Sequence, residues 1–142
     1  MASDVLLNKV ATIERCVRRV REEYAAAGSN FASDFTHQDA AILNIQRACE
    51  AVLDIGNHLV RSERLGAPQS ARDVFTLLAQ AGWIDAKLAD SLKHMVAFRN
   101  IAVHEYQNLL LPITEKIIRD HLDEFLVFGQ AILKRDGNRT PN

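Results

Sequence analysis

The sequence predicts an all-α fold, an antiparallel bundle of four to five helices in a single domain. Apolar residues recur at spacings of three and four along most of the chain, which is the period of an amphipathic helix. Capping residues, glycines and prolines separate these segments. No segment alternates between apolar and polar residues as a half-buried strand does. We expect the folded domain to span residues 1–135 and residues 136–142 to form a disordered tail.

Length and composition restrict the class of protein. The 142 residues suffice for one domain, and 48% hydrophobic with 25% charged residues is typical of a soluble globular chain. The net charge of −1 indicates no overall basic field, so a polyanion would have to bind a local patch. No apolar run approaches the roughly 20 residues of a membrane span. The N-terminus lacks a signal peptide, so we expect a cytoplasmic protein without a membrane partner.

The helix boundaries follow from local signals. The first helix is expected over residues 5–26, before Gly28, Ser29 and Asn30. Thr36 is the expected N-cap of the second helix, with Asp39 in a near capping box, and this helix should end near Leu65–Gly66.

The second half of the chain shows three further helical segments. Ser70 is expected to cap a short third helix that runs through Ala81, and a fourth helix should start around Asp85. Pro112 fits the first turn of a last helix, where its missing N–H costs nothing.

The two cysteines and the histidines suggest no metal site. Cys16 and Cys49 lie within helical patterns, where reduced core thiols are expected. No cluster of His, Asp or Glu has the spacing of metal ligands, and His58 lacks nearby partners of that kind. We therefore predict no metal and no cofactor.

The stretch FRNIAVHEY, residues 98–106, places an arginine, a histidine and a tyrosine in an apolar run. Arg99 falls on the core-facing stripe of the fourth helix, and Tyr106 lies about 20° from the same line. His104 lies about 140° from Arg99 on an ideal helix, so the two do not meet side by side. They share a cleft if the helix ends or distorts after Arg99, or if a second chain closes the space. We predict a homodimer in which the two copies of residues 99–106 face each other. Alternatively, Arg99 is structural and held by a carboxylate.

This stretch resembles the R-x4-6-H signature of HEPN domains, in the longer R-x4-H-x-Y form of the HepT toxins. The segments EAVLDIGNHL and SARDVFTLLAQAGWI are also similar to that family. The resemblance implies a dimeric helical bundle that brings two signature motifs into one cleft and cleaves RNA without a metal. It also implies a partner, the MntA nucleotidyltransferase antitoxin, which neutralises the toxin by transferring AMP to a tyrosine.

Carried onto this sequence, the resemblance implies that Arg99 and His104 are catalytic and that Asn100 supports them. Tyr106 would be the tyrosine that receives AMP. The chemistry agrees, because the substrate's 2′-OH can serve as nucleophile when histidine transfers a proton near neutral pH. Arginine stays charged and presents a planar fork to phosphate oxygens.

Glu50 and Asp54 are candidate supporting residues on the second helix. They belong to a polar stripe at spacings of three and four, formed by Arg47, Glu50, Asp54, Asn57, His58 and Arg61. Either this stripe is a solvated face with i,i+4 pairs, or Glu50 or Asp54 pairs with Arg99 and orients it. The first helix carries Arg15, Arg18, Arg19 and Arg21, which form either a patch for RNA or an acidic partner, or a solvated face balanced by glutamates.

Two functions remain open. The first is a toxin that acts as a metal-independent endoribonuclease and is neutralised by AMP transfer to Tyr106, as a homodimer that can enter a larger hetero-oligomer with its antitoxin. The second is a non-catalytic helical accessory subunit that binds a partner nucleotidyltransferase. The intact signature favours the first.

Overall fold

The computed structural model describes residues 3–104 and 107–138, and the side chains of residues 3–100 and 111–138. Within these ranges the chain is helical and contains no strand, which confirms the all-α prediction. The elements are α1 (Asp4–Ala27), the 3-10 turn η1 (Gly28–Asn30), α2 (Phe35–Ser62), α3 (Ala71–Gln80), α4 (Ala86–His104), α5 (Gln107–Asp120) and α6 (Leu122–Gly137).

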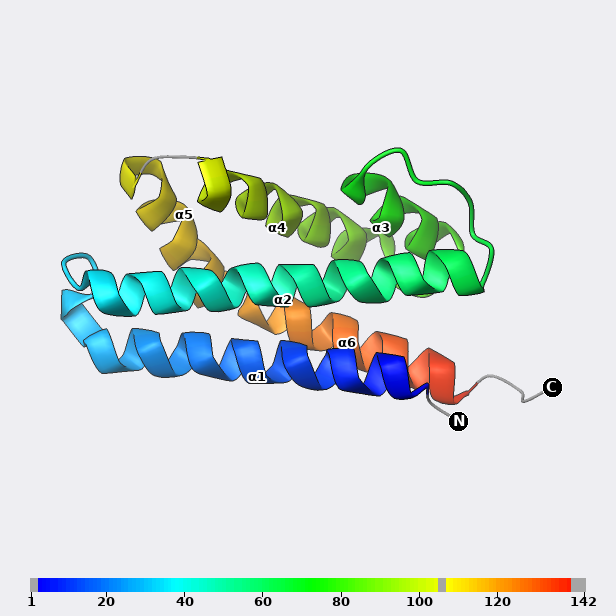
Figure 1. Ribbon diagram of the computed structural model, residues 1–142, viewed down its shortest axis with the longest axis horizontal. Coiled ribbons are helices and arrows are strands. Elements are labelled where there is room, and N and C mark those ends of the chain that lie inside the picture. Colours follow the sequence, from blue (N-terminus) through cyan, green and yellow to red (C-terminus); the bar gives the residue numbers. More distant parts are fainter. Residues whose placement is uncertain (1–2, 105–106, 139–142) are drawn as a thin grey trace.

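Two long antiparallel helices, α1 and α2, run side by side along the bundle (Figure 1). The last helix, α6, packs along α1, whereas α3 and α4 pack against α2. The start of α1 and the end of α6 lie at the same end of the molecule (Figure 1), where the Ser3 backbone N–H donates to Asp136 Oδ2 over 2.7 Å. α4 returns along α2 in the opposite direction, so its residues face those of the middle of α2 (Figure 1).

One apolar core joins the six described α-helices. Its fully buried large side chains are Leu6, Ile13, Ile45, Ile55, Leu59, Phe75, Leu78, Leu92, Phe98, Phe125, Phe128 and Ile132. Gly56 allows α3 to approach α2 closely, because a Cβ atom at this position would lie 2.5 Å from Val74 Cγ1. A larger residue at position 56 would push the two helices apart.

The predicted ends of α1 and the start of α3 are confirmed. α1 begins and ends within one residue of the expected bounds. Ser70 caps α3 as expected, since its Oγ accepts from the Asp73 N–H over 3.3 Å. Asp85 accepts from the Leu88 N–H over 2.7 Å at the start of α4, and Gly82 adopts the left-handed conformation (φ 81°) after α3.

The expected ends of α2 were wrong by a few residues. The N-cap is Asp34 and not Thr36, because Asp34 Oδ1 accepts from the His37 N–H over 3.1 Å. α2 ends at Ser62, short of Leu65–Gly66, since Arg64 adopts a left-handed conformation (φ 54°). The Leu65 N–H then donates to the Val60 carbonyl, which closes the helix without a glycine.

The single last helix expected from Pro112 is in fact two helices, α5 and α6, that meet at His121. Pro112 lies inside α5, five residues after its start, and not in a first turn. The packing of α5 against α4 and α6 outweighs the lost backbone hydrogen bond. α6 continues to Gly137, and Asp136 is buried.

None of the described helices is long and apolar enough to cross a bilayer. The described side chains also include no group of three or more His, Cys, Asp or Glu residues arranged to hold a metal ion. Cys16 and Cys49 are buried free thiols, as predicted.

Candidate functional site

Arg99 lies on the face of α4 that meets the polar stripe of α2. Met95 and Leu92, one and two turns earlier on α4, are buried in the core. The Arg99 side chain is 27% exposed, so it lies at the rim of the core and does not fill it. Its guanidinium Nη1 donates to Glu50 Oε1 over 3.0 Å. The other guanidinium N–H groups have no partner among the described residues and remain available to an anion.

Of the two acidic candidates, only Glu50 contacts Arg99. Asp54, one turn further along α2, pairs with Lys9 of α1 over 2.8 Å. The sequence offered no signal for the Lys9 pair, because it depends on how α1 and α2 are aligned. Asn100 is exposed, next to Arg99. His104 is the last residue of α4, but its side chain and all of Tyr106 lie outside the described residues.

A groove of about 310 Å³ opens beside Arg99, and we call it the polar groove. Arg99, Glu50, Asp54, Asn57, Gln69 and Ser70 supply its polar lining, and Leu53, Pro68, Ala71 and Val74 supply its apolar walls. The groove thus joins the middle of α2, the loop before α3, the first turn of α3 and one residue of α4. Asn57 was part of the expected polar stripe, whereas the contribution of Gln69 follows only from the path of the loop.

Cys49, beside Glu50, is a structural thiol. It is buried, and its Sγ donates to the Met95 carbonyl over 3.4 Å. Burial raises the pKa of the Cys49 thiol to about 12, although the positive charge of Arg99 opposes this shift. Because thiols attack as thiolates, Cys49 is not a nucleophile at neutral pH. Burial also raises the pKa of Cys16.

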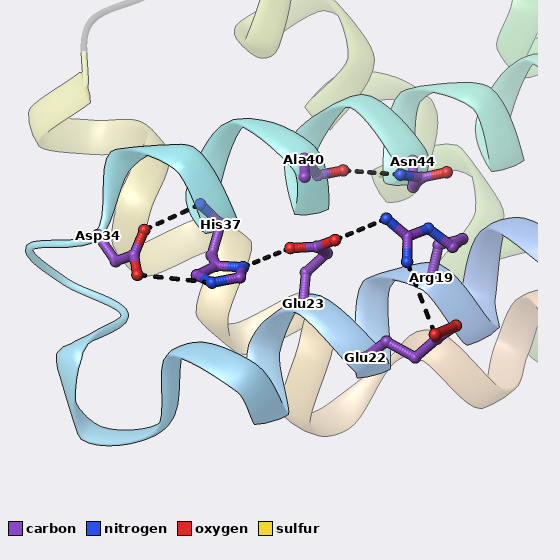
Figure 2. Close-up of polar contacts among 7 residues, drawn as sticks. All are labelled: Arg19, Glu22, Glu23, Asp34, His37, Ala40 and Asn44. Atoms are coloured by element: carbon purple, nitrogen blue, oxygen red, sulfur yellow. Dashed lines mark hydrogen bonds and ion pairs between the residues drawn. The ribbon is translucent and has the colours of Figure 1, made fainter.

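A second polar cluster lies where α1 connects to α2 (Figure 2). Glu23 of α1 contacts Arg19 over 2.6 Å and is hydrogen-bonded to His37 of α2, which faces Asp34 at 3.7 Å. This hydrogen bond with the His37 side chain lowers the pKa of Glu23. These contacts link α1 to α2 and so stabilise the hairpin that the two helices form. They also give Arg19, one of the first-helix arginines, a partner.

The other first-helix arginines divide into paired and unpaired residues. Arg21 contacts Asp123 of α6 over 2.6 Å, at the surface. Arg15 and Arg18 are exposed and make no ion pair within the described part of the chain. For Arg15 and Arg18, both alternatives therefore remain: an anion-binding patch or a solvated surface.

An apolar pocket of about 490 Å³ lies on a neighbouring face of α4, between α4, α5 and the start of α6. Met95, Ala97, Phe98, Ile113 and Ile117 form its floor, and Ser91, His94, Lys116 and His121 stand around them. Of its polar residues, His121 contacts Glu124 over 2.8 Å.

The chain is similar to proteins of known family and structure. The profile of the Ribonuclease HepT-like family matches residues 13–132. The chain is 52% identical over 130 residues to the mRNA nuclease HepT of Shewanella oneidensis, covering 92% of this chain and 97% of that protein. It is also similar to the solved structure of the tri-AMPylated Shewanella oneidensis HEPN toxin in complex with MNT antitoxin, with a TM-score of 0.86 and 51% identity over 92% of this chain and 97% of that one.

A second solved structure, a toxin–antitoxin complex with AMP-PNP, is 51% identical with a TM-score of 0.86, covering 92% of this chain and 98% of that one. The matched region includes every helix that lines the polar groove. The chain therefore belongs to the Ribonuclease HepT-like family.

Proposed function

We propose that this chain is the toxin of a toxin–antitoxin pair and cleaves RNA at Arg99 and His104. The observation that supports the proposal best is the position of Arg99, held by Glu50 at the end of an open polar groove. The 52% identical relative is named an mRNA nuclease, which supports RNA as the substrate class.

The proposed reaction uses the 2′-OH of RNA as the nucleophile. His104 transfers protons to or from the reacting oxygens, since an imidazole titrates near neutral pH. Arg99 stabilises the charge that develops on the phosphate, and Glu50 orients its guanidinium. Asn100 supports these residues, and Asp54 extends the polar stripe. This mechanism assigns no step to a metal ion, so cleavage should persist in chelator.

The proposed active form is a cytoplasmic homodimer. Arg99 and His104 lie about 140° apart on an ideal helix, so one motif alone does not present both groups to a single phosphate. A two-fold arrangement of residues 99–106 would bring an arginine of one copy near a histidine of the other. Light scattering should show twice the chain mass, and a monomer at micromolar concentration would contradict this part of the proposal.

Regulation is proposed to occur at Tyr106. A partner nucleotidyltransferase would add AMP to the phenol oxygen, as the tri-AMPylated relative in complex with its antitoxin suggests. Each added phosphate is an anion that would compete with RNA for Arg99. Intact mass spectrometry after incubation with the partner enzyme and ATP-Mg²⁺ should show AMP-sized adducts on wild type and none on Tyr106→Phe.

The deciding experiment compares wild type with His104→Ala on single-stranded RNA, with and without chelator. We expect wild type to cleave in both conditions, and the variant to lose at least about two orders of magnitude in rate. Cleavage that survives in His104→Ala would refute its role. No cleavage by wild type would leave the alternative, a non-catalytic subunit that binds the nucleotidyltransferase.

A further inference from the structure

The polar groove extends from Arg99 along α2, and no described side chain fills it. Its volume of about 310 Å³ falls at the lower end of sites for small ligands. Glu50, Asp54 and Asn57 line it at successive turns of α2, a span of about 10.5 Å along the helix. The groove is therefore longer than a site for one phosphate requires.

Part of the groove lining is apolar. Leu53 and Val74 are buried, and the close approach of α2 and α3 at Gly56 holds Val74 in place. Pro68 and Ala71, which also line the groove, are half-buried. A flat aromatic ligand can pack against these apolar side chains, as unpaired bases do in RNA-binding proteins.

The polar lining is rich in hydrogen-bond acceptors. Glu50 uses Oε1 to bind Arg99, and Asp54 uses Oδ2 to bind Lys9. The second oxygen of each carboxylate, and the whole Asn57 amide, have no partner among the described residues. Two partly neutralised carboxylates repel a phosphate but accept N–H groups well. The lining therefore fits a nucleobase whose phosphate lies at Arg99.

We propose that the polar groove is a base-recognition pocket for the nucleotide next to the phosphate that Arg99 binds. This proposal rests on the proposed ribonuclease function. The preferred base is guanine, because its N1–H and amino group lie side by side and can both donate to carboxylate oxygens. Adenine and cytosine offer one amino group. Uracil offers one N–H between two carbonyl oxygens that the carboxylates repel, so it is the poorest ligand.

Binding and cleavage are measured separately. Short fluorescent RNAs carry G, A, C or U at one position in a constant sequence, with a 2′-deoxy nucleotide at the scissile position, which prevents cleavage through the 2′-OH. Fluorescence anisotropy gives the affinity of wild type for each RNA, and all-ribose versions give the cleavage rates. We expect the strongest binding and the fastest cleavage with G and the weakest with U, about tenfold apart, the scale of one base contact.

Asp54→Asn and Asn57→Ala should each reduce the ratio of G to U affinity severalfold. Both residues are exposed, so circular dichroism should show an unchanged fold. The matched control is Asp39→Asn, an exposed aspartate of α2 outside the groove, which should keep the wild-type ratio.

Three results would each overturn the base-recognition pocket: equal affinity of wild type for the four RNAs, a preference for U, or a ratio of G to U affinity that is unchanged in both groove variants. Cleavage of the all-ribose RNAs would still support the ribonuclease in each case. Conversely, a G preference without any cleavage would uphold the pocket and refute the proposed reaction.

Discussion

Phe98 and Arg99 are neighbours on α4, yet their side chains border two hollows of opposite character. Phe98 is 1% exposed and forms part of the apolar pocket of about 490 Å³, whereas Arg99 stands at the polar groove of about 310 Å³. Consecutive residues point about 100° apart on a helix, which is enough to separate the two regions.

The two regions differ in what holds them together. The apolar side chains that line the apolar pocket stabilise the fold by leaving water. This effect does not require the side chains to be oriented in a particular direction. The polar groove is lined by the carboxylates of two specific ion pairs, Arg99–Glu50 and Lys9–Asp54, formed by residues distant in the sequence. α4 thus contributes to the core on one face and carries the proposed anion site on the next, so substitutions on the two faces should have separable effects.

The largest expected effect is on stability. Phe98→Ala should lower the free energy of unfolding by about 3–5 kcal/mol, because it removes a fully buried ring and enlarges the hollow beside it. Urea denaturation followed by circular dichroism measures this change. At low temperature, the folded fraction should still cleave RNA, and a folded but inactive variant would show that the two faces are not separable.

Arg99→Ala should produce the opposite pattern. We expect RNA cleavage to fall at least about 100-fold, since the cation at the phosphate is lost. Stability should change by less than about 1 kcal/mol, because the ion pair with Glu50 is solvent-accessible. Arg99→Lys should also be impaired, because an ammonium group lacks the planar fork of arginine. Near-normal cleavage by Arg99→Ala would contradict the assignment of the anion site.

Glu50→Gln should have a smaller effect on the same reaction. The neutral amide keeps the size of the side chain but orients the Arg99 guanidinium less firmly, so we expect kcat to fall about tenfold. Glu50→Asp should recover part of this loss, and Asp39→Asn serves as the matched control on α2. If Glu50→Gln and Asp39→Asn behave alike in steady-state kinetics, Glu50 is not a positioning residue.

The smallest expected effect lies away from both hollows. Glu23→Gln should lower the melting temperature by a few degrees at most near neutral pH, through loss of the charged contacts with His37 and Arg19 (Figure 2). The pKa of Glu23 is lowered in the folded state, so its contribution is present above its ordinary value of 4.5 and is lost as the pH falls through the lower folded value.

Melting curves of wild type and Glu23→Gln should therefore converge as the pH falls below 4.5. RNA cleavage at neutral pH should be unchanged, because the cluster does not line the polar groove. A difference in melting temperature that grows in acid would contradict the stabilising role of the Glu23 contacts with His37 and Arg19.

Local sequence signals were enough to predict the all-α class, the bounds of α1, the cap of α3 and the polar stripe of α2. These features depend on residues within one or two helical turns, so periodicity and capping chemistry suffice to predict them. The motif that carries Arg99 could also be read directly. The Asp34 cap and the division of the last helix at His121 could not, because nearby residues offered equally good local signals.

Only the tertiary structure decided which partner each polar residue meets. Glu50 and Asp54 lie one turn apart and have the same charge, yet one reaches Arg99 of α4 and the other reaches Lys9 of α1. The polar groove likewise exists because Gly56 lets α3 approach α2 and brings Gln69 and Ser70 beside Asn57. Contacts between distant segments depend on helix alignment and packing distance, which are set by the whole core and not by local spacing.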